Sequence, residues 1–141
     1  MDYDTISADA FGAGLRGFGI NLLVVDIAYE VAFLTEVFEM TAHRVSADFA
    51  ILVSGNAVFQ LHSDGTYHAN PALGLVPETP PRGGGAELRL YDIAPEAAVD
   101  RAIARGDIIL QPPTDKPHGL CEAYILSPSG YAWVPSRPLS D

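Results

Sequence analysis

The sequence predicts an α+β fold built from two tandem copies of one unit, each running strand, helix, strand, strand, strand. The main observation is an internal repeat, because segment 22–32 returns as 88–98 with the Asp-Ile-Ala triplet, a glutamate and the last alanine identical. A second pair of similar segments, 48–52 and 122–126, follows, and each is succeeded by a turn and another strand-like run. Ligands often bind where two such copies face each other, so the repeat also predicts a shared cleft between the modules.

Length and composition indicate a folded domain. The 141 residues suffice for one compact domain or for two half-domains that share a core, and 48% hydrophobic with 18% charged residues argues against disorder. No apolar run reaches the roughly 20 residues that span a bilayer, and the acidic start lacks the features of a signal peptide. A single cysteine suits a reducing compartment, so we expect a cytoplasmic protein. The net charge of −10 disfavours nucleic acid and anionic membranes, and favours cationic or neutral small molecules.

The first module is predicted to span residues 18–65, after an N-terminal extension at 1–17. Residues 12–17 match the G-x-G-x-x-G pattern, but no strand precedes them, so we reject a dinucleotide site. A short apolar run predicts a strand at 20–25, and Asp26 is placed to cap a helix whose apolar residues recur at helical spacing up to Phe38. Strands are predicted at 42–45, 49–54 and 57–62, with a hairpin turn at 54–56.

A stretch rich in proline and glycine, residues 66–85, is predicted to link the modules and to lie partly over the site. The second module is expected at 86–136, with a tail at 137–141. It begins with a strand at 86–91, after which Asp92 caps a helix that runs to Arg105 and ends at Gly106. Strands follow at 108–111, 121–126 and 131–135. The segment 112–119 is long for a hairpin and is expected to reach over one end of the sheet.

This pattern resembles the vicinal oxygen chelate superfamily, which includes glyoxalase, bleomycin-resistance and extradiol-dioxygenase-type proteins. The resemblance is carried by segment 22–26 leading into the first helix, by its echo at 88–92, and by His118-Gly119 followed by the turn at 127–131. It covers nearly the whole chain and implies that each four-stranded set curls into an incomplete barrel, with both sets lining one cleft. It also implies a homodimer. Since the superfamily supports many chemistries, the resemblance does not name a reaction.

The resemblance further implies where a metal ion would be held. Metal-using members place one ligand on the first strand of each copy, seven residues before the capping aspartate, and another on the last strand. In this sequence the four positions are Gly19, Gln60, Gly85 and Val134. Glycine and valine offer no side-chain donor, and a catalytic zinc or iron ion needs about three protein ligands. We therefore predict that the usual metal site is absent, and we predict no cofactor.

Strand alternation indicates which side chains line the cleft in place of metal ligands. Together with the repeat pairing, it predicts a lining of Asn21, Gln60, His62, Glu87, Arg89, Glu122 and Tyr124. Each has an ordinary structural alternative. Glu87 and Arg89 can neutralise each other, Glu122 can pair with Arg89 or Lys116, His62 can sit at a solvated rim, and Tyr124 can be a core aromatic. Trp133 alternates away from Val134 and is predicted to pack against a helix or a partner subunit.

Two main functional hypotheses follow from this lining. The first is a metal-independent protein that binds a small cationic or aromatic molecule in the cleft, as the antibiotic-sequestering branch of the superfamily does. The second is a lyase, isomerase or dioxygenase-type enzyme that uses Glu87, Glu122 and His62 for proton transfer or for an atypical metal site. A partner-binding protein with a vestigial cleft is a third hypothesis.

Overall fold

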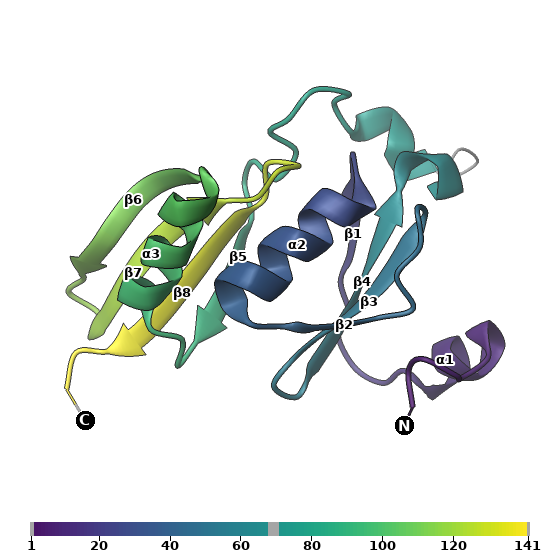
Figure 1. The fold of residues 1–141 in the computed structure, drawn as a ribbon, viewed down its shortest axis with the longest axis horizontal. Coiled ribbons are helices and arrows are strands. Elements are labelled where there is room, and N and C mark those ends of the chain that lie inside the picture. Colours follow the sequence, from purple (N-terminus) through teal and green to yellow (C-terminus); the bar gives the residue numbers. More distant parts are fainter. Residues whose placement is uncertain (1, 68–70, 141) are drawn as a thin grey trace.

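The computed structural model describes residues 2–67 and 71–140, which form two four-stranded mixed sheets and three α-helices (Figure 1). The first module contains β1 (Asn21–Val24), α2 (Ile27–Phe38), β2 (Thr41–His43), β3 (Phe49–Ser54) and β4 (Ala57–Ser63). The second contains β5 (Glu87–Tyr91), α3 (Pro95–Arg105), β6 (Ile108–Asp115), β7 (Leu120–Leu126) and β8 (Ala132–Pro138). The sheet orders are β1-β4-β3-β2 and β5-β8-β7-β6, and neither sheet closes into a barrel. The predicted α+β fold of two repeated modules is confirmed.

Helix α2 begins where the sequence predicts. The Asp26 side chain accepts a hydrogen bond of 3.0 Å from the backbone N–H of Tyr29, which satisfies one of the free donors of the first turn. The buried residues of the helix, among them Phe33, Leu34 and Val37, recur at helical spacing and face the first sheet. The helix ends at Phe38 and is followed by Glu39 at the C-cap position, which adopts the left-handed conformation with φ of 57°.

Helix α3 begins two residues later than its repeat partner predicts. Asp92 does not cap it; this residue lies in a turn with φ of 61°, and Ala94 stands at the cap position without a side-chain hydrogen bond. The cause is Pro95, because a proline disfavours helical backbone at the residue before it and is itself well suited to the first helical position. The predicted end is confirmed, since Gly106 closes the helix with φ of 84°.

The prediction of a long loop at 112–119 is wrong. Strand β6 continues to Asp115 through two shifts in its register with β7, and the connection is a tight turn at 116–119. Gly119 in this turn has φ of 91°. Pro112 and Pro113 are tolerated within β6 because it is the outer strand of its sheet and is bulged there, so their missing N–H groups break no regular ladder.

The N-terminal extension contains a helix that the sequence reading did not predict, α1 (Ala8–Gly14), capped by the Ser7 hydroxyl. This extension lies against the face of the first sheet opposite α2 (Figure 1). Ala42 of β2 packs toward the helices, so its neighbour His43 points to the other face. There the His43 ring meets Tyr3 at 5.6 Å between centroids, and its Nδ1 lies 3.1 Å from an Asp4 carboxylate oxygen.

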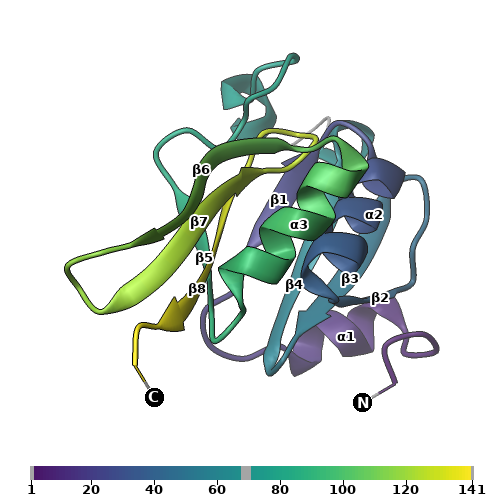
Figure 2. The same ribbon diagram turned by 60° about the vertical axis from the view of Figure 1, so that its left-hand side comes forward.

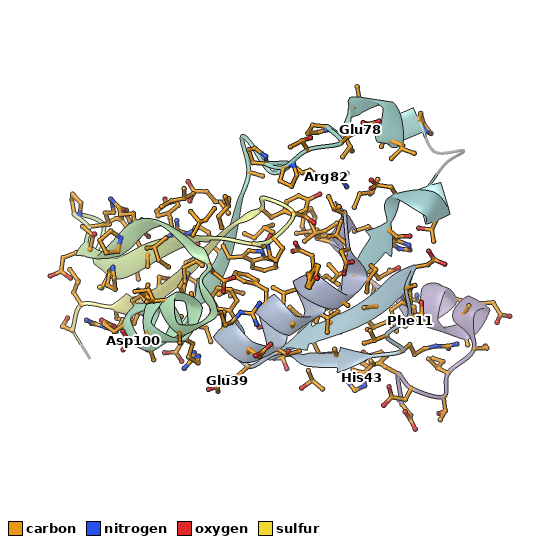
Figure 3. The ribbon with its side chains drawn as sticks, turned by 45° about the horizontal axis from the view of Figure 1, so that its top comes forward. Phe11, Glu39, His43, Glu78, Arg82 and Asp100 are labelled. Carbon is orange, nitrogen blue, oxygen red and sulfur yellow. The ribbon has the colours of Figure 1, made fainter. Side chains whose placement is uncertain are left out.

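The linker between the modules is tied to the first module through Arg82 (Figure 3). The Arg82 guanidinium donates two hydrogen bonds to Asp64, of 2.6 and 2.7 Å, and its side chain is only 2% exposed. It also donates to the carbonyl oxygen of Leu23 at 3.4 Å. A short 3-10 helix, Asp64–Tyr67, leads from the first module into the linker, and a second, Pro71–Leu75, lies within the linker. Part of the segment predicted to cross the site, residues 68–70, lies outside the described residues.

The two modules share one hydrophobic core. Helices α2 and α3 lie side by side, and a single cluster of buried residues draws on both helices and both sheets (Figure 2). Trp133 of β8 is central to it, because its ring contacts Phe38 at 6.0 Å and Phe59 at 5.7 Å, both in the first module. The prediction that Trp133 packs against a helix is confirmed. Within the described ranges, every helix is too short or too polar to cross a membrane.

A buried carboxyl group also joins the modules. Glu30 of α2 is fully buried, and its Oε1 accepts a hydrogen bond from the backbone N–H of Ser129 in the turn between β7 and β8. Its Oε2 has no hydrogen-bond partner among the described residues. Burial raises the pKa of the Glu30 carboxyl, although the Ser129 N–H and nearby hydroxyls act against the rise. Ionised Glu30 is therefore poorly compensated at this junction.

We expect the Glu30→Gln variant to gain stability relative to the wild type as the pH rises. A group whose pKa is raised in the folded state stabilises the fold below its ordinary pKa of 4.5, and this contribution is lost as the pH rises through the raised value. Glutamine does not titrate, so the variant lacks this loss. Urea denaturation at pH 4, 6 and 8 measures the difference. The exposed Glu78→Gln serves as control, and a difference that is constant with pH would contradict the prediction.

Candidate functional site

The predicted site residues lie on the faces of the two sheets that point away from the helices. Leu22 and Leu61 pack in the helix-covered core, so Asn21, Gln60 and His62 face the other side of the first sheet. In the second sheet Leu88 and Trp133 face the core, and Glu87 and Arg89 face away from it. The repeat pairing of 48–52 with 122–126 is shifted by one residue, however, because Ala50 lies in the core whereas its counterpart Tyr124 is on the open face.

The predicted residues of the first sheet form one small polar group. Asn21 and Gln60 are register partners on β1 and β4, and the Gln60 side-chain oxygen lies 3.1 Å from Nε2 of His62. The Phe49 ring packs against the His62 imidazole at 5.1 Å between centroids. Burial lowers the pKa of His62. The imidazole is therefore neutral near pH 7.

The predicted residues of the second sheet form a charged network around Arg89. Its guanidinium donates to Glu87 at 2.8 Å and to Glu122, and the Tyr124 hydroxyl donates to Glu87 at 3.1 Å. Nε2 of His118 lies 3.3 Å from the Glu122 carboxylate, a contact that the sequence reading missed because it crosses the tight turn at 116–119. The anticipated pairing of Glu122 with Arg89 is confirmed.

Arg89 determines the charge state of this network. Burial alone would raise the pKa of Glu122, whose side chain is only 3% exposed, but hydrogen bonds from Arg89 and His118 lower it on balance. Its hydrogen bond with Glu122 in turn raises the pKa of Arg89 above its usual range. The Glu122 carboxylate is thus ionised and bound to the guanidinium at neutral pH. It is a poor proton acceptor in this state, because a proton must compete with Arg89.

The positions where the resemblance implies metal ligands do not fit a divalent ion. Gly19 and Gly85 precede β1 and β5, and the residues that pair with Gln60 and Val134 are Asn21 and Arg89. Two neutral amides, a guanidinium and a valine do not make a donor set for zinc or iron. Among the residues that the structure describes, no group of three or more histidine, cysteine, aspartate or glutamate side chains is placed to hold a metal ion.

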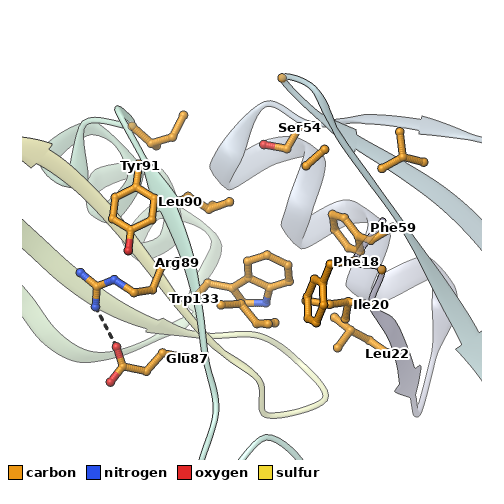
Figure 4. Close-up of a pocket in the computed structure, with 16 residues that line it drawn as sticks. Phe18, Ile20, Leu22, Ser54, Phe59, Glu87, Arg89, Leu90, Tyr91 and Trp133 are labelled. Carbon is orange, nitrogen blue, oxygen red and sulfur yellow. Dashed lines mark hydrogen bonds and ion pairs between the residues drawn. The ribbon is translucent and has the colours of Figure 1, made fainter. Parts of the chain in front are cut away.

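A pocket of about 430 Å³ lies between the two modules (Figure 4). The strands line it mostly with residues of the faces that point toward the helices, and not with the open faces that carry the predicted site residues. Its walls are mainly apolar and aromatic, with Phe18, Ile20, Phe59, Leu88, Leu90 and Trp133 among them. Of the seven predicted site residues, only Glu87 and Arg89 line it. The Glu87 side chain is about half exposed, so this ion pair marks the solvated edge of the pocket. The Trp133 indole N–H has no acceptor among the described residues.

Sequence reasoning missed most of these pocket residues. Ile20, Leu88 and Trp133 alternate toward the core side of their strands, which predicts ordinary packing. The pocket exists because the ends of β1 and β4 and the strand β5 approach each other from different modules, and strand periodicity carries no information about that approach. An aromatic flanked by two glycines, as Phe18 is, was the one available signal.

No protein-family model matches the chain, and no curated protein matches it either. Solved structures do. A glyoxalase/bleomycin resistance protein/dioxygenase from Nocardioides is 20% identical, with a TM-score of 0.68 over 94% of this chain and 90% of that one. A glyoxalase/bleomycin resistance protein/dioxygenase family enzyme from Burkholderia phytofirmans PsJN is 21% identical, with a TM-score of 0.71 over 85% and 96%. A glyoxalase-related enzyme from Fulvimarina pelagi is 19% identical, with a TM-score of 0.69 over 87% and 88%. The chain has the fold of the vicinal oxygen chelate superfamily.

Proposed function

We propose that this protein binds a small aromatic molecule with a positive charge in the pocket between its two modules, without a metal ion at the usual positions. The observation that carries the proposal is the pocket itself. Its volume of about 430 Å³ lies in the range of small-molecule sites. Its walls combine apolar and aromatic side chains from both modules, and such walls favour flat organic rings.

The preference for a cation rests on the charged network around Arg89, of which Glu87 and Arg89 reach the edge of the pocket and Glu122 lies outside its lining. Glu87 and Glu122 share the single guanidinium of Arg89, which leaves one negative charge in excess. The chain as a whole carries a net charge of −10, which raises the local concentration of cationic ligands. The structural neighbours that are described as bleomycin resistance proteins share this fold and support the proposal by likeness alone.

The alternative of an enzyme acting through Glu87, Glu122 and His62 is less well supported. Glu87 and Glu122 belong to the second sheet and are held by Arg89, whereas His62 belongs to the first sheet and contacts Gln60. Proton transfer requires the acid and base to reach one substrate. We therefore favour the binding function.

The sole tryptophan of the chain makes the proposal directly testable, because Trp133 lines the pocket. We expect 9-aminoacridine, a planar cation, to quench Trp133 fluorescence in a saturable way and to raise the melting temperature by mass action. Neutral acridine should bind more weakly. Glu87→Gln should weaken 9-aminoacridine about threefold and leave acridine unchanged, since a partly exposed ion pair contributes about 0.2–1 kcal/mol.

A variant that fills the pocket provides the control. Ala57 lines the pocket and is exposed, so Ala57→Phe should block binding without disturbing the core. Ala28→Phe makes the same change on the exposed surface of α2, away from the pocket, and should bind normally. The proposal is wrong if isothermal titration detects no heat with either acridine, or if Ala57→Phe binds as tightly as the wild type.

A further inference from the structure

Phe18 is an exposed aromatic side chain that nevertheless lines the pocket. It is 92% exposed, the highest value among the large hydrophobic residues of the described chain, and it lies beside the Trp133 side of the pocket in Figure 4. The other aromatic residues in that wall are fixed by ring contacts, Trp133 with Phe38 and with Phe59. Phe18 makes no ring contact within residues 2–67 and 71–140. Single exposed aromatic residues are common on protein surfaces and need no explanation. Phe18 differs because it lies beside an apolar pocket, whose wall its ring can contact if it moves.

The backbone around Phe18 is suited to movement. It stands between Gly17, which has φ of 79°, and Gly19, and a Cβ atom added to either glycine would meet nothing within 4 Å. The glycines are therefore not required by close packing of neighbouring groups. Their effect is on the backbone, because glycine reaches conformations that other residues avoid. Phe18 thus lies between two conformationally permissive residues, in the segment that joins α1 to β1.

We infer that Phe18 is a lid that closes over a bound ring and gives the pocket its preference for aromatic over saturated ligands. The inference rests on the proposed function. Phe18 and Trp133 both line the pocket, so a closing Phe18 would give a flat ring bound beside Trp133 a second aromatic contact. The gain in binding free energy comes from removing the exposed Phe18 ring from water, and the cost of ordering the loop reduces it.

Two probes of similar size and equal charge separate the lid from the rest of the pocket. They are 9-aminoacridine, which is fully aromatic, and tacrine, in which one outer ring is saturated. We expect the wild type to bind 9-aminoacridine more tightly. Phe18→Ala should weaken 9-aminoacridine about tenfold, equivalent to about 1.4 kcal/mol, and tacrine less. Phe18→Leu keeps apolar area but not the aromatic ring. It should restore tacrine binding to the wild-type level, but not the preference for 9-aminoacridine over tacrine. Dissociation constants come from isothermal titration calorimetry.

Movement of the lid has its own readout. In F18W the emission of the introduced indole should shift to shorter wavelength when tacrine binds, because the side chain leaves water. Tyr29→Ala is the matched control, since Tyr29 is an exposed aromatic on α2 that does not line the pocket. It should leave both dissociation constants unchanged.

The outcomes distinguish the two proposals. If the wild type binds 9-aminoacridine and Phe18→Ala binds both probes with unchanged affinity, the lid is overturned and the binding function stands. If Phe18→Ala weakens both probes equally, Phe18 adds apolar area only and the aromatic preference is overturned. If the wild type binds neither probe, the binding function and the lid fail together.

Discussion

Replacing Trp133 with alanine is expected to lower the free energy of unfolding by about 3 to 5 kcal/mol, the usual cost of deleting a large buried aromatic side chain. The Trp133 side chain is 3% exposed and contacts Phe38 and Phe59 across the boundary between the modules. Its loss opens a cavity in the one cluster that both modules share. Urea denaturation followed by far-UV circular dichroism measures the change.

The same experiment tests whether the modules unfold together. Because their core is continuous, the wild type and Trp133→Ala should each unfold in one transition. Leu75→Ala, which truncates an 86% exposed side chain, should change the stability by no more than about 0.5 kcal/mol. Two separated transitions in the wild type, or a loss below about 1 kcal/mol in Trp133→Ala, would refute this description of the core.

Arg89→Met is expected to destabilise the protein by about 3 kcal/mol at pH 7, because it leaves the buried Glu122 carboxylate without its main partner. The effect should shrink as the pH falls. In the wild type Arg89 helps keep the pKa of Glu122 low, so its contribution is present above the ordinary pKa of 4.5 and is lost as the pH falls through the lowered value. In the variant only His118 opposes the effect of burial on the pKa of Glu122. The ionised carboxylate therefore costs more free energy at neutral pH, and protonation in acid removes that cost.

Two further variants identify the cause of this loss. The double variant Arg89→Met/Glu122→Gln removes both charges and should recover most of the stability at pH 7. Arg89→Lys keeps the positive charge but cannot bind two carboxylates with a planar fork, so it should lie between the wild type and Arg89→Met. Chemical denaturation at pH 4 and pH 7 provides the measurement. Equal losses at both pH values would show that lost packing, rather than the unpaired carboxylate, explains the effect.

The repeat was sufficient to predict the order and approximate bounds of the elements, and its failures have local causes. Identical Asp-Ile-Ala triplets start a helix directly at Asp26 but not at Asp92, because Pro95 restrains the residue before it. Prolines 112 and 113 were interpreted as loop residues, although an edge strand tolerates them. Helix α1 has a single buried residue, Phe11, so the sequence shows no apolar periodicity that would have predicted this helix.

The candidate site was predicted less completely than the fold. Alternation placed Glu87 and Arg89 correctly on the open face of their strand, and the two residues also reach the edge of the pocket. The pocket walls depend on how one module meets the other, and residues such as Ile20 and Leu88 show only the apolar pattern of ordinary packing. Phe18 belongs to no strand or helix pattern, since its relation to the pocket comes from the path of a loop, and only its two flanking glycines distinguish it in the sequence.

The continuous core has a consequence for how the two copies depend on each other. Trp133 in the second copy is buried by rings of the first, and α3 packs beside α2. A free half of this chain would expose that surface and would need a second molecule to cover it, an encounter governed by protein concentration. Joining the halves through one linker makes that encounter intramolecular, at a high effective concentration. Burial of this interior is therefore independent of how dilute the protein becomes.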